Sequence, residues 1–169
     1  MDTAAILALV LACAPQVHAD TARALVQVES SFNPWAIGVV EGSLDRQPRD
    51  RTEALATARA LRQAGWNFSL GLGQINVANL DRLGLTLEDA FEPCTNLAAM
   101  QTVLLDCFDR AESASPGSRS AQAALRQALS CYYSGNFVTG VQQGYVRQVT
   151  RAAMTPRRFT LPVASKESP

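Results

Sequence analysis

The segment NLAAMQTVLLDCFDRA at Asn96–Ala111 decides the fold class of this chain. Its apolar residues recur at intervals of three and four, so they share one side of an α-helix. These residues are Leu97, Met100, Leu104, Cys107 or Phe108, and Ala111. Either Thr95 or Asn96 is expected to cap this helix, because short polar side chains accept hydrogen bonds from the first free N–H groups. The segment predicts the most regular helix of the chain.

Helical patterns continue along most of the remaining sequence. One helix is expected over residues 4–13, capped by Asp2 or Thr3 and stopped by Pro15, and another from the cap Asp20 to Ser30. Further helices are expected over residues 50–64, 86–90, 120–131 and 144–153. Residues 39–48 are expected to form an irregular loop, and Ser115–Ser118 a turn. The predicted class is therefore mainly α, with at most a small β-hairpin.

The overall composition is that of one globular domain. The chain has 169 residues, of which 47% are apolar and 18% are charged. We expect a single helical domain over residues 1–154 and a flexible tail over residues 155–169, where three prolines and few large apolar residues occur. Fifteen basic residues balance fifteen acidic ones, and no basic cluster is interleaved with aromatic residues. Nucleic acid is therefore not an expected partner.

The single histidine, His18, restricts the possible chemistry. One histidine excludes a zinc site of the H-E-x-x-H type and leaves a hydrolytic triad only if His18 is its base. His18 lies between Pro15 and Asp20, where we expect an ordinary turn or surface residue. No metal and no cofactor are predicted.

The apolar run Ala4–Cys13 has two interpretations. It has the length of a signal-peptide core, but the leader would carry Asp2 and no Lys or Arg, which does not suit an export signal. Ten residues are also too few to span a bilayer, so no integral membrane segment is expected. We favour the first helix of the folded domain.

The four cysteines, Cys13, Cys94, Cys107 and Cys131, include no C-x-x-C pair and have no second histidine to complete a zinc site. An even number favours two disulfides and an oxidising compartment such as the periplasm, with four buried free thiols as the alternative. Cys107 and Cys131 lie on consecutive helices at heights that differ by about one helical turn. We predict the pairs Cys107–Cys131 and Cys13–Cys94 among the three possible pairings.

Glu29 interrupts the apolar side of the helix that ends at Ser30. That side also carries Ala22, Leu25, Val28 and Phe32. Partial burial and the negative end of the helix both favour the protonated carboxyl, which raises its pKa. A general acid for glycosidic cleavage needs such a carboxyl. The alternative is a glutamate at the edge of the stripe that reaches solvent.

Two further segments carry candidate ligand-binding groups. In Ser69–Asn76, SLGLGQIN, two glycines allow close approach of the backbone, and Gln74 and Asn76 offer amides that can bind sugar hydroxyl and acetamido groups. The alternative is a tight turn between helices. Tyr132 and Tyr133 precede a turn, and Tyr145 opens the last helix as its odd polar group. Tyrosines at helix ends also commonly just pack.

The order of these motifs resembles that of the soluble lytic transglycosylase family. The motifs are Glu29-Ser30, Gly71–Asn76, Tyr132–Gly135 and Tyr145-Val146. Residues 33–39 and 91–97 are similar to the VirB-type transglycosylases of type IV secretion systems. The resemblance covers about residues 13–149. Related chains often carry a cysteine near the N-terminus together with the one at Cys94, which also favours the Cys13–Cys94 pair.

The resemblance implies a lysozyme-like fold and cleavage of the β-1,4 bond between N-acetylmuramic acid and N-acetylglucosamine, with 1,6-anhydromuramoyl products. Glu29 would be the single catalytic carboxylate, unlike the pair used by most glycosidases. Tyr145 would orient Glu29, Gln74 would line the sugar cleft, and Tyr132 would border it. Ser69 and Asn76 are further cleft candidates. This chain has Tyr133 and Ser134 in place of the commoner Asn and Ala, so a sugar contact assigned to that Asn is not carried over.

The same resemblance implies a monomer in the periplasm, with peptidoglycan strands and type IV secretion components as partners. The alternatives are a hydrolytic muramidase or chitinase, a non-catalytic wall-binding scaffold subunit, and a plain helical adaptor. An intact Glu29 argues against the scaffold, and the Gly-Leu-Gly-Gln segment argues against the adaptor.

Overall fold

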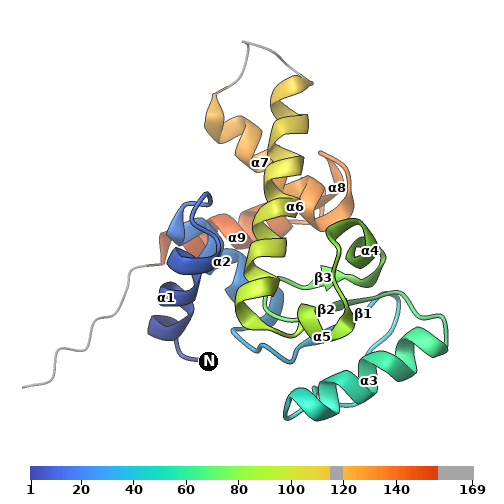
Figure 1. Ribbon diagram of the computed structural model, residues 1–169. Coiled ribbons are helices and arrows are strands. Elements are labelled where there is room, and N and C mark those ends of the chain that lie inside the picture. The colour runs from blue at the N-terminus through green and yellow to red at the C-terminus, as the bar shows by residue number, and fades with distance from the viewer. Residues whose placement is uncertain (115–119, 156–169) are drawn as a thin grey trace, which may run out of the picture.

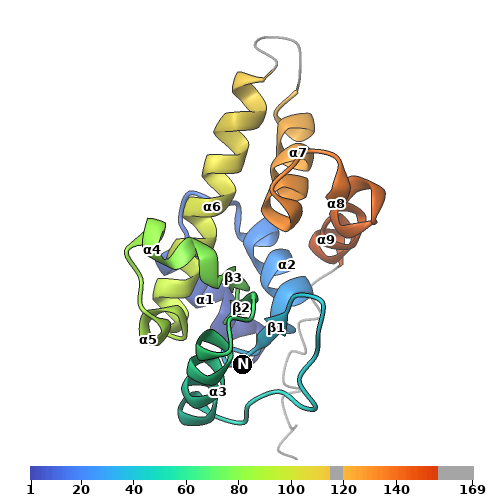
Figure 2. The ribbon, with the colours of Figure 1, turned by 90° about the vertical axis from the view of Figure 1, so that its right-hand side faces the viewer.

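Helix α6 (Pro93–Ser113) is the helix around which the others are arranged (Figures 1 and 2). Its predicted stripe is confirmed, because Leu97, Met100, Leu104, Cys107 and Ala111 are all buried. Helix α7 (Ala121–Ser134) lies along it, and α1 (Thr3–Cys13) contacts it from another side. The computed structural model describes residues 1–114 and 120–155. The predicted turn at 115–118 and all but the first residue of the predicted tail lie outside this range.

The remaining elements are short apart from three helices of 10 to 13 residues. They are α2 (Ala19–Ser30), β1 (Ile37–Val39), α3 (Arg51–Gln63), β2 (Phe68–Leu70), β3 (Ile75–Asn76), the 3-10 helix η1 (Val77–Asn79), α4 (Leu80–Leu83), α5 (Leu87–Ala90), α8 (Thr139–Gln142) and α9 (Tyr145–Met154). Helix α2 packs against α9. The three strands lie beside the N-terminal half of α6, which contacts β3 (Figures 1 and 2). The mainly α class is confirmed.

Two predicted helix starts are wrong. Helix α6 begins at Pro93, and its cap is Glu92, three or four residues before the predicted cap. Proline suits the first helical position, because its missing N–H would have had no partner there. In α2 the cap is His18, whose Nδ1 accepts from the N–H of Asp20. Asp20 lies in the first turn, where its negative charge interacts favourably with the positive end of the helix dipole.

Four other caps follow the expected chemistry. The side chains of Asp2, Asp50, Thr86 and Ser120 each accept a hydrogen bond from the N–H three residues later. Helix α1 buries Ile6, Val10 and Cys13 against the rest of the described chain. Among the described residues no helix is both long and apolar enough to cross a bilayer.

The sheet is larger than the predicted hairpin. Its three strands are antiparallel in the order β1-β2-β3. Ser69 pairs with Gly38 on one side and with Asn76 on the other, so these three residues form a row across the sheet. Strands of two or three residues are too short to show an alternating pattern, which is why only part of this sheet could be expected from the sequence.

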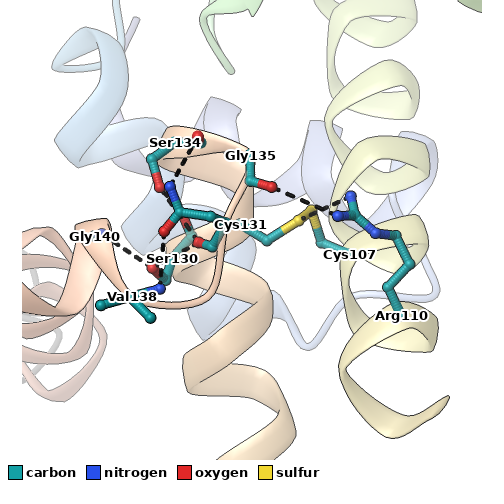
Figure 3. The surroundings of a disulfide bond; sticks show 9 residues. Cys107, Arg110, Ser130, Cys131, Ser134, Gly135, Val138 and Gly140 are labelled. Atoms are coloured by element: carbon teal, nitrogen blue, oxygen red, sulfur yellow. Dashed lines mark hydrogen bonds between the residues drawn. A yellow bond between two sulfur atoms is a disulfide. The ribbon is translucent and has the colours of Figure 1, made fainter. Parts of the chain in front are cut away.

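Both predicted disulfides are confirmed. Cys13–Cys94 joins α1 to the start of α6, and Cys107–Cys131 joins α6 to α7, with Cα–Cα distances of 5.2 and 5.7 Å. Figure 3 shows Arg110 beside the second disulfide, where its guanidinium donates to the Cys131 sulfur at 3.4 Å. No cysteine is left free. The two cross-links fix both neighbours of α6 to it.

Removing the two disulfides separately should cost different amounts of stability. Cys13–Cys94 closes 81 residues of chain and Cys107–Cys131 only 24. In the chain-entropy account these loops contribute about 4–5 and about 3–4 kcal/mol respectively. Urea unfolding of the two Cys→Ala double variants should therefore show the larger loss for Cys13→Ala/Cys94→Ala. The reverse order would mean that constraint of the unfolded chain does not govern their contribution.

Candidate active site

Glu29 and Tyr145 meet where α2 packs against α9. Glu29 is the second-last residue of α2, and Tyr145 is the first residue of α9. The Tyr145 hydroxyl donates a hydrogen bond to Glu29 Oε1, so the predicted contact is confirmed. The buried Arg23 strengthens the pairing of the two helices, because its guanidinium donates to the carbonyl of Ala152 at 2.7 Å. Two residues 116 positions apart are thus held as a unit.

Burial raises the pKa of Glu29 to about 7, although the hydrogen bond from Tyr145 acts in the opposite direction. The pKa of Tyr145 is raised well above its ordinary value, by burial and by the negative charge of Glu29. The tyrosine therefore stays protonated and keeps its proton as a donor. Near neutral pH the carboxyl of Glu29 is poised both to give and to take a proton.

Glu29 opens into a cleft of about 270 Å³. Four predicted residues, Ser69, Gln74, Asn76 and Tyr132, line this cleft together with Glu29. Tyr145 is only 5% exposed and touches the carboxylate rather than lining the cleft. The cleft is also lined by Tyr133, the neighbour of Tyr132 in the predicted motif, and by six residues that the sequence did not indicate as ligand-binding: Gly38, Val39, Val40, Ile75, Asn79 and Val103. Three of them, Gly38, Val39 and Val40, lie on β1 or just after it, so recognising β1 would have identified these three.

Gln74 presents mainly an acceptor to the cleft. Its amide nitrogen donates to the carbonyls of Ala36, at 3.1 Å, and Gly71, at 2.9 Å. A Cβ added at position 38 would lie only 2.6 Å from the side-chain oxygen of Gln74. Gly38 thereby leaves room for the amide, and the Gln74 oxygen is suited to receive an N–H from a ligand.

Asn96 holds the loop that carries Gln74, although its sequence position indicated only a helix cap. Its side chain is 1% exposed, donates to the carbonyls of Leu70 and Ala90, and accepts from the N–H of Gly73 at 2.7 Å. Gly71 has a φ of +73°, and a Cβ there would lie 2.4 Å from the Asn96 amide nitrogen. The glycines of the segment are therefore needed by packing as well as by the turn.

Two tyrosines at the end of α7 complete the wall beside Glu29. The Tyr132 hydroxyl donates to the carbonyl of Gly73. The ring of Tyr133 stacks on Tyr145 with centroids 4.5 Å apart, and its hydroxyl donates to Gln143 at 2.9 Å. Tyr133 thus supports the tyrosine that contacts Glu29, a role that no signal in the sequence indicated.

Asn76 and Ser69 differ in what they can offer a ligand. The Asn76 amide donates to Asn67 at 2.8 Å and to Ser69 Oγ at 3.4 Å, while its oxygen accepts from the N–H of Ala78. Every polar atom of Asn76 thus has a partner within the protein. Ser69 accepts one bond and keeps its hydroxyl proton for a ligand. Sugar binding by either residue remains a prediction.

The described residues contain no group of three or more His, Cys, Asp or Glu side chains that could hold a metal ion. His18 lies outside the cleft lining and caps α2. The titratable chemistry of the cleft therefore centres on the pair Glu29 and Tyr145.

In comparisons with known protein families, residues 7–154 match the family described as "Transglycosylase SLT domain". The type IV secretion system protein virB1 of Brucella suis biovar 1 is 49% identical over 152 residues, covering 87% of this chain and 63% of the relative. The protein virB1 of Agrobacterium fabrum is 33% identical over 159 residues, covering 93% of this chain and 63% of the relative. The chain thus spans less than two thirds of these relatives. No solved structure shows a significant match.

Replacing Tyr145 by Phe should raise the pKa of Glu29 above about 7, because the hydrogen bond that stabilises the carboxylate is lost. One hydrogen bond is worth about 0.5–1.5 kcal/mol net, which corresponds to roughly one pKa unit or less. A titration of the Glu29 carboxyl followed by carbon NMR would measure the change. An unchanged or lowered pKa would show that Tyr145 does not stabilise the charged form.

The raised pKa of Glu29 should also make the protein less stable as the pH rises. Between pH 4.5, the ordinary pKa of a glutamate, and about 7, the folded state binds more protons than the unfolded state, so the unfolding free energy falls with pH. Glu29→Gln should remove this slope and stabilise the protein by about 1–3 kcal/mol above pH 7. Urea unfolding at pH 4.5 and 8 measures it, with the exposed Glu112→Gln as a control. Equal gains at both pH values would contradict the argument.

Proposed function

The chain belongs to the transglycosylase SLT domain family, and on this basis we propose that it is a peptidoglycan lytic transglycosylase with Glu29 as its only acid–base residue. The observation that carries the proposal is the placement of Glu29. Its carboxyl has a pKa of about 7, opens into a cleft lined by hydroxyl and amide groups, and receives a hydrogen bond from Tyr145. Glycosidic cleavage at neutral pH requires such a carboxyl.

In the first step the protonated Glu29 donates to the oxygen that links N-acetylmuramic acid to N-acetylglucosamine. The bond from that oxygen to the anomeric carbon breaks, and the acetamido group of the same muramoyl residue assists at this carbon. The leaving sugar departs with a 4-hydroxyl, and Glu29 is left as a carboxylate. Tyr145 then stabilises the carboxylate through its hydrogen bond.

In the second step the Glu29 carboxylate takes the proton of the muramoyl 6-hydroxyl. The oxygen of this hydroxyl bonds to the anomeric carbon, which closes a 1,6-anhydro ring and displaces the acetamido oxygen. Glu29 returns to its protonated form, and no water is consumed. A group with a pKa of about 7 serves both directions of transfer, so a second carboxylate is not needed.

The cleft supplies groups suited to holding the sugars. The Gln74 oxygen would accept an acetamido N–H, the Ser69 hydroxyl would donate to a sugar oxygen, and Tyr132 would bound the cleft with its ring. Since the Tyr132 hydroxyl is already bonded to Gly73, its contribution would come from the ring face. These roles support a polysaccharide ligand.

The relatives suggest where this activity would be used. The Brucella relative is named a type IV secretion system protein, and we infer that this chain opens peptidoglycan for such a system. Two disulfides fit an oxidising compartment, which supports maturation in the periplasm. The chain would act there as a monomer on glycan strands and with secretion components.

Glu29→Gln tests the proposal. General acid catalysis is commonly worth ~10²–10⁴-fold, and both steps depend on this group, so clearing of purified sacculi should fall by at least that range. The exposed Glu112→Gln should clear sacculi at the normal rate. Mass spectrometry of the released muropeptides should find 1,6-anhydromuramoyl ends.

Two results would overturn the proposal. If Glu29→Gln retained more than about a tenth of the normal rate, Glu29 would not be the acid. If reducing ends were the main product, the protein would be a hydrolytic muramidase, because water rather than the 6-hydroxyl would have attacked.

A further inference from the structure

The face of the sheet that lines the cleft continues beyond the row of Gly38, Ser69 and Asn76. The N–H of Val40 donates to the carbonyl of Asn67 at 2.9 Å, which extends the pairing of β1 and β2. Alternate side chains of a strand lie on the same face of the sheet. Val40 therefore lies on the same face as Gly38, and Asn67 lies on the same face as Ser69. Val40 lines the cleft and is 46% exposed, and Asn67 is exposed beside it.

Val40 and Asn67 lie at the opposite end of the strands from Gln74. Gln74 bonds to Ala36 and Gly71 at one end of the strands, and Tyr132, which lines the cleft together with Glu29, bonds to Gly73 there. Four residues of extended chain separate Ala36 from Val40, a distance of about 13 Å. That length exceeds one pyranose ring, so Val40 and Asn67 would face a sugar further along the strand.

The orientation of the Asn67 amide follows from a chain of hydrogen bonds. The N–H of Ala78 can only donate, so the Asn76 atom that it reaches must be the oxygen. The Asn76 nitrogen therefore faces Asn67 and requires an acceptor there, which is the Asn67 oxygen at 2.8 Å. The Asn67 nitrogen is left without a hydrogen bond to any described residue, and its two protons are available to a ligand.

We propose that Val40 and Asn67 form an outer sugar subsite of the cleft. It rests on the proposed function, since it takes a second part of the same β-1,4-linked glycan. The Asn67 nitrogen donates to an acetamido carbonyl or a hydroxyl, and Val40 packs against the apolar face of the ring. Apolar contact combined with a few oriented polar groups is the usual composition of ligand sites. Asn76 is a positioning residue that holds the Asn67 oxygen inward.

Binding of neutral β-1,4-linked N-acetylglucosamine oligomers to the Glu29→Gln protein tests the subsite by calorimetry, without turnover. Asn67→Ala removes both the donor and the acceptor of this side chain. Asn67→Asp keeps an acceptor for Asn76 but has no N–H to donate. Both variants should bind a hexamer about three- to tenfold more weakly, as expected for one hydrogen bond, and a dimer unchanged. The exposed Gln63→Ala is the matched control and should change neither.

Each remaining outcome has a distinct meaning. If Asn67→Asp binds the hexamer normally while Asn67→Ala does not, Asn67 only anchors Asn76, and the subsite is refuted. Equal weakening of dimer and hexamer, or no weakening of either, also refutes it. If the parent Glu29→Gln protein binds no oligomer of any length, the proposed glycan cleft itself fails.

Discussion

The cleft depends on one buried amide. The Asn96 side chain joins the end of β2, the Gly71–Gln74 turn and the end of α5 to the first turn of α6, using all three of its hydrogen bonds at once. A buried amide left unsatisfied is costly, so the turn has little freedom to move away from α6. Because the same turn presents Gln74 and bonds to Tyr132, the floor of the cleft and its tyrosine wall are fixed by one side chain.

The pKa of Glu29 is set by packing rather than by neighbouring charges. Glu29 owes its raised pKa first to burial at the contact of α2 and α9, and Tyr145 moderates that effect. Helix α9 is aligned by Arg23, and the ring of Tyr133 on α7 stacks on Tyr145. Three helices therefore determine the protonation of one carboxyl. This arrangement would let a single residue serve in turn as acid and base, as the proposed mechanism requires.

Much of the fold and of the candidate site could be predicted from the sequence, wherever the deciding interaction is local or the apolar pattern is strongly periodic. The stripe of α6, the Asp2 cap of α1 and Glu29 on an apolar helix side are of this kind. The features that were missed depend on partners far away in the chain. Asn96 looked like a helix cap and is a tertiary anchor, and Asn67 acquires a defined orientation only through β3. Very short strands show no periodicity, so residues such as Val40 could not be assigned to the cleft.

The close approach of Gly71 and Asn96 limits how this cleft can change over time. Any side chain at position 71 would need the space of the Asn96 amide, and a smaller residue at position 96 would lose three hydrogen bonds to the backbone. Neither position can be substituted alone without loss, so the two form an epistatic pair. Substitutions that change ligand preference are therefore expected at the rim of the cleft. Side chains there are exposed, and their replacement disturbs no buried network.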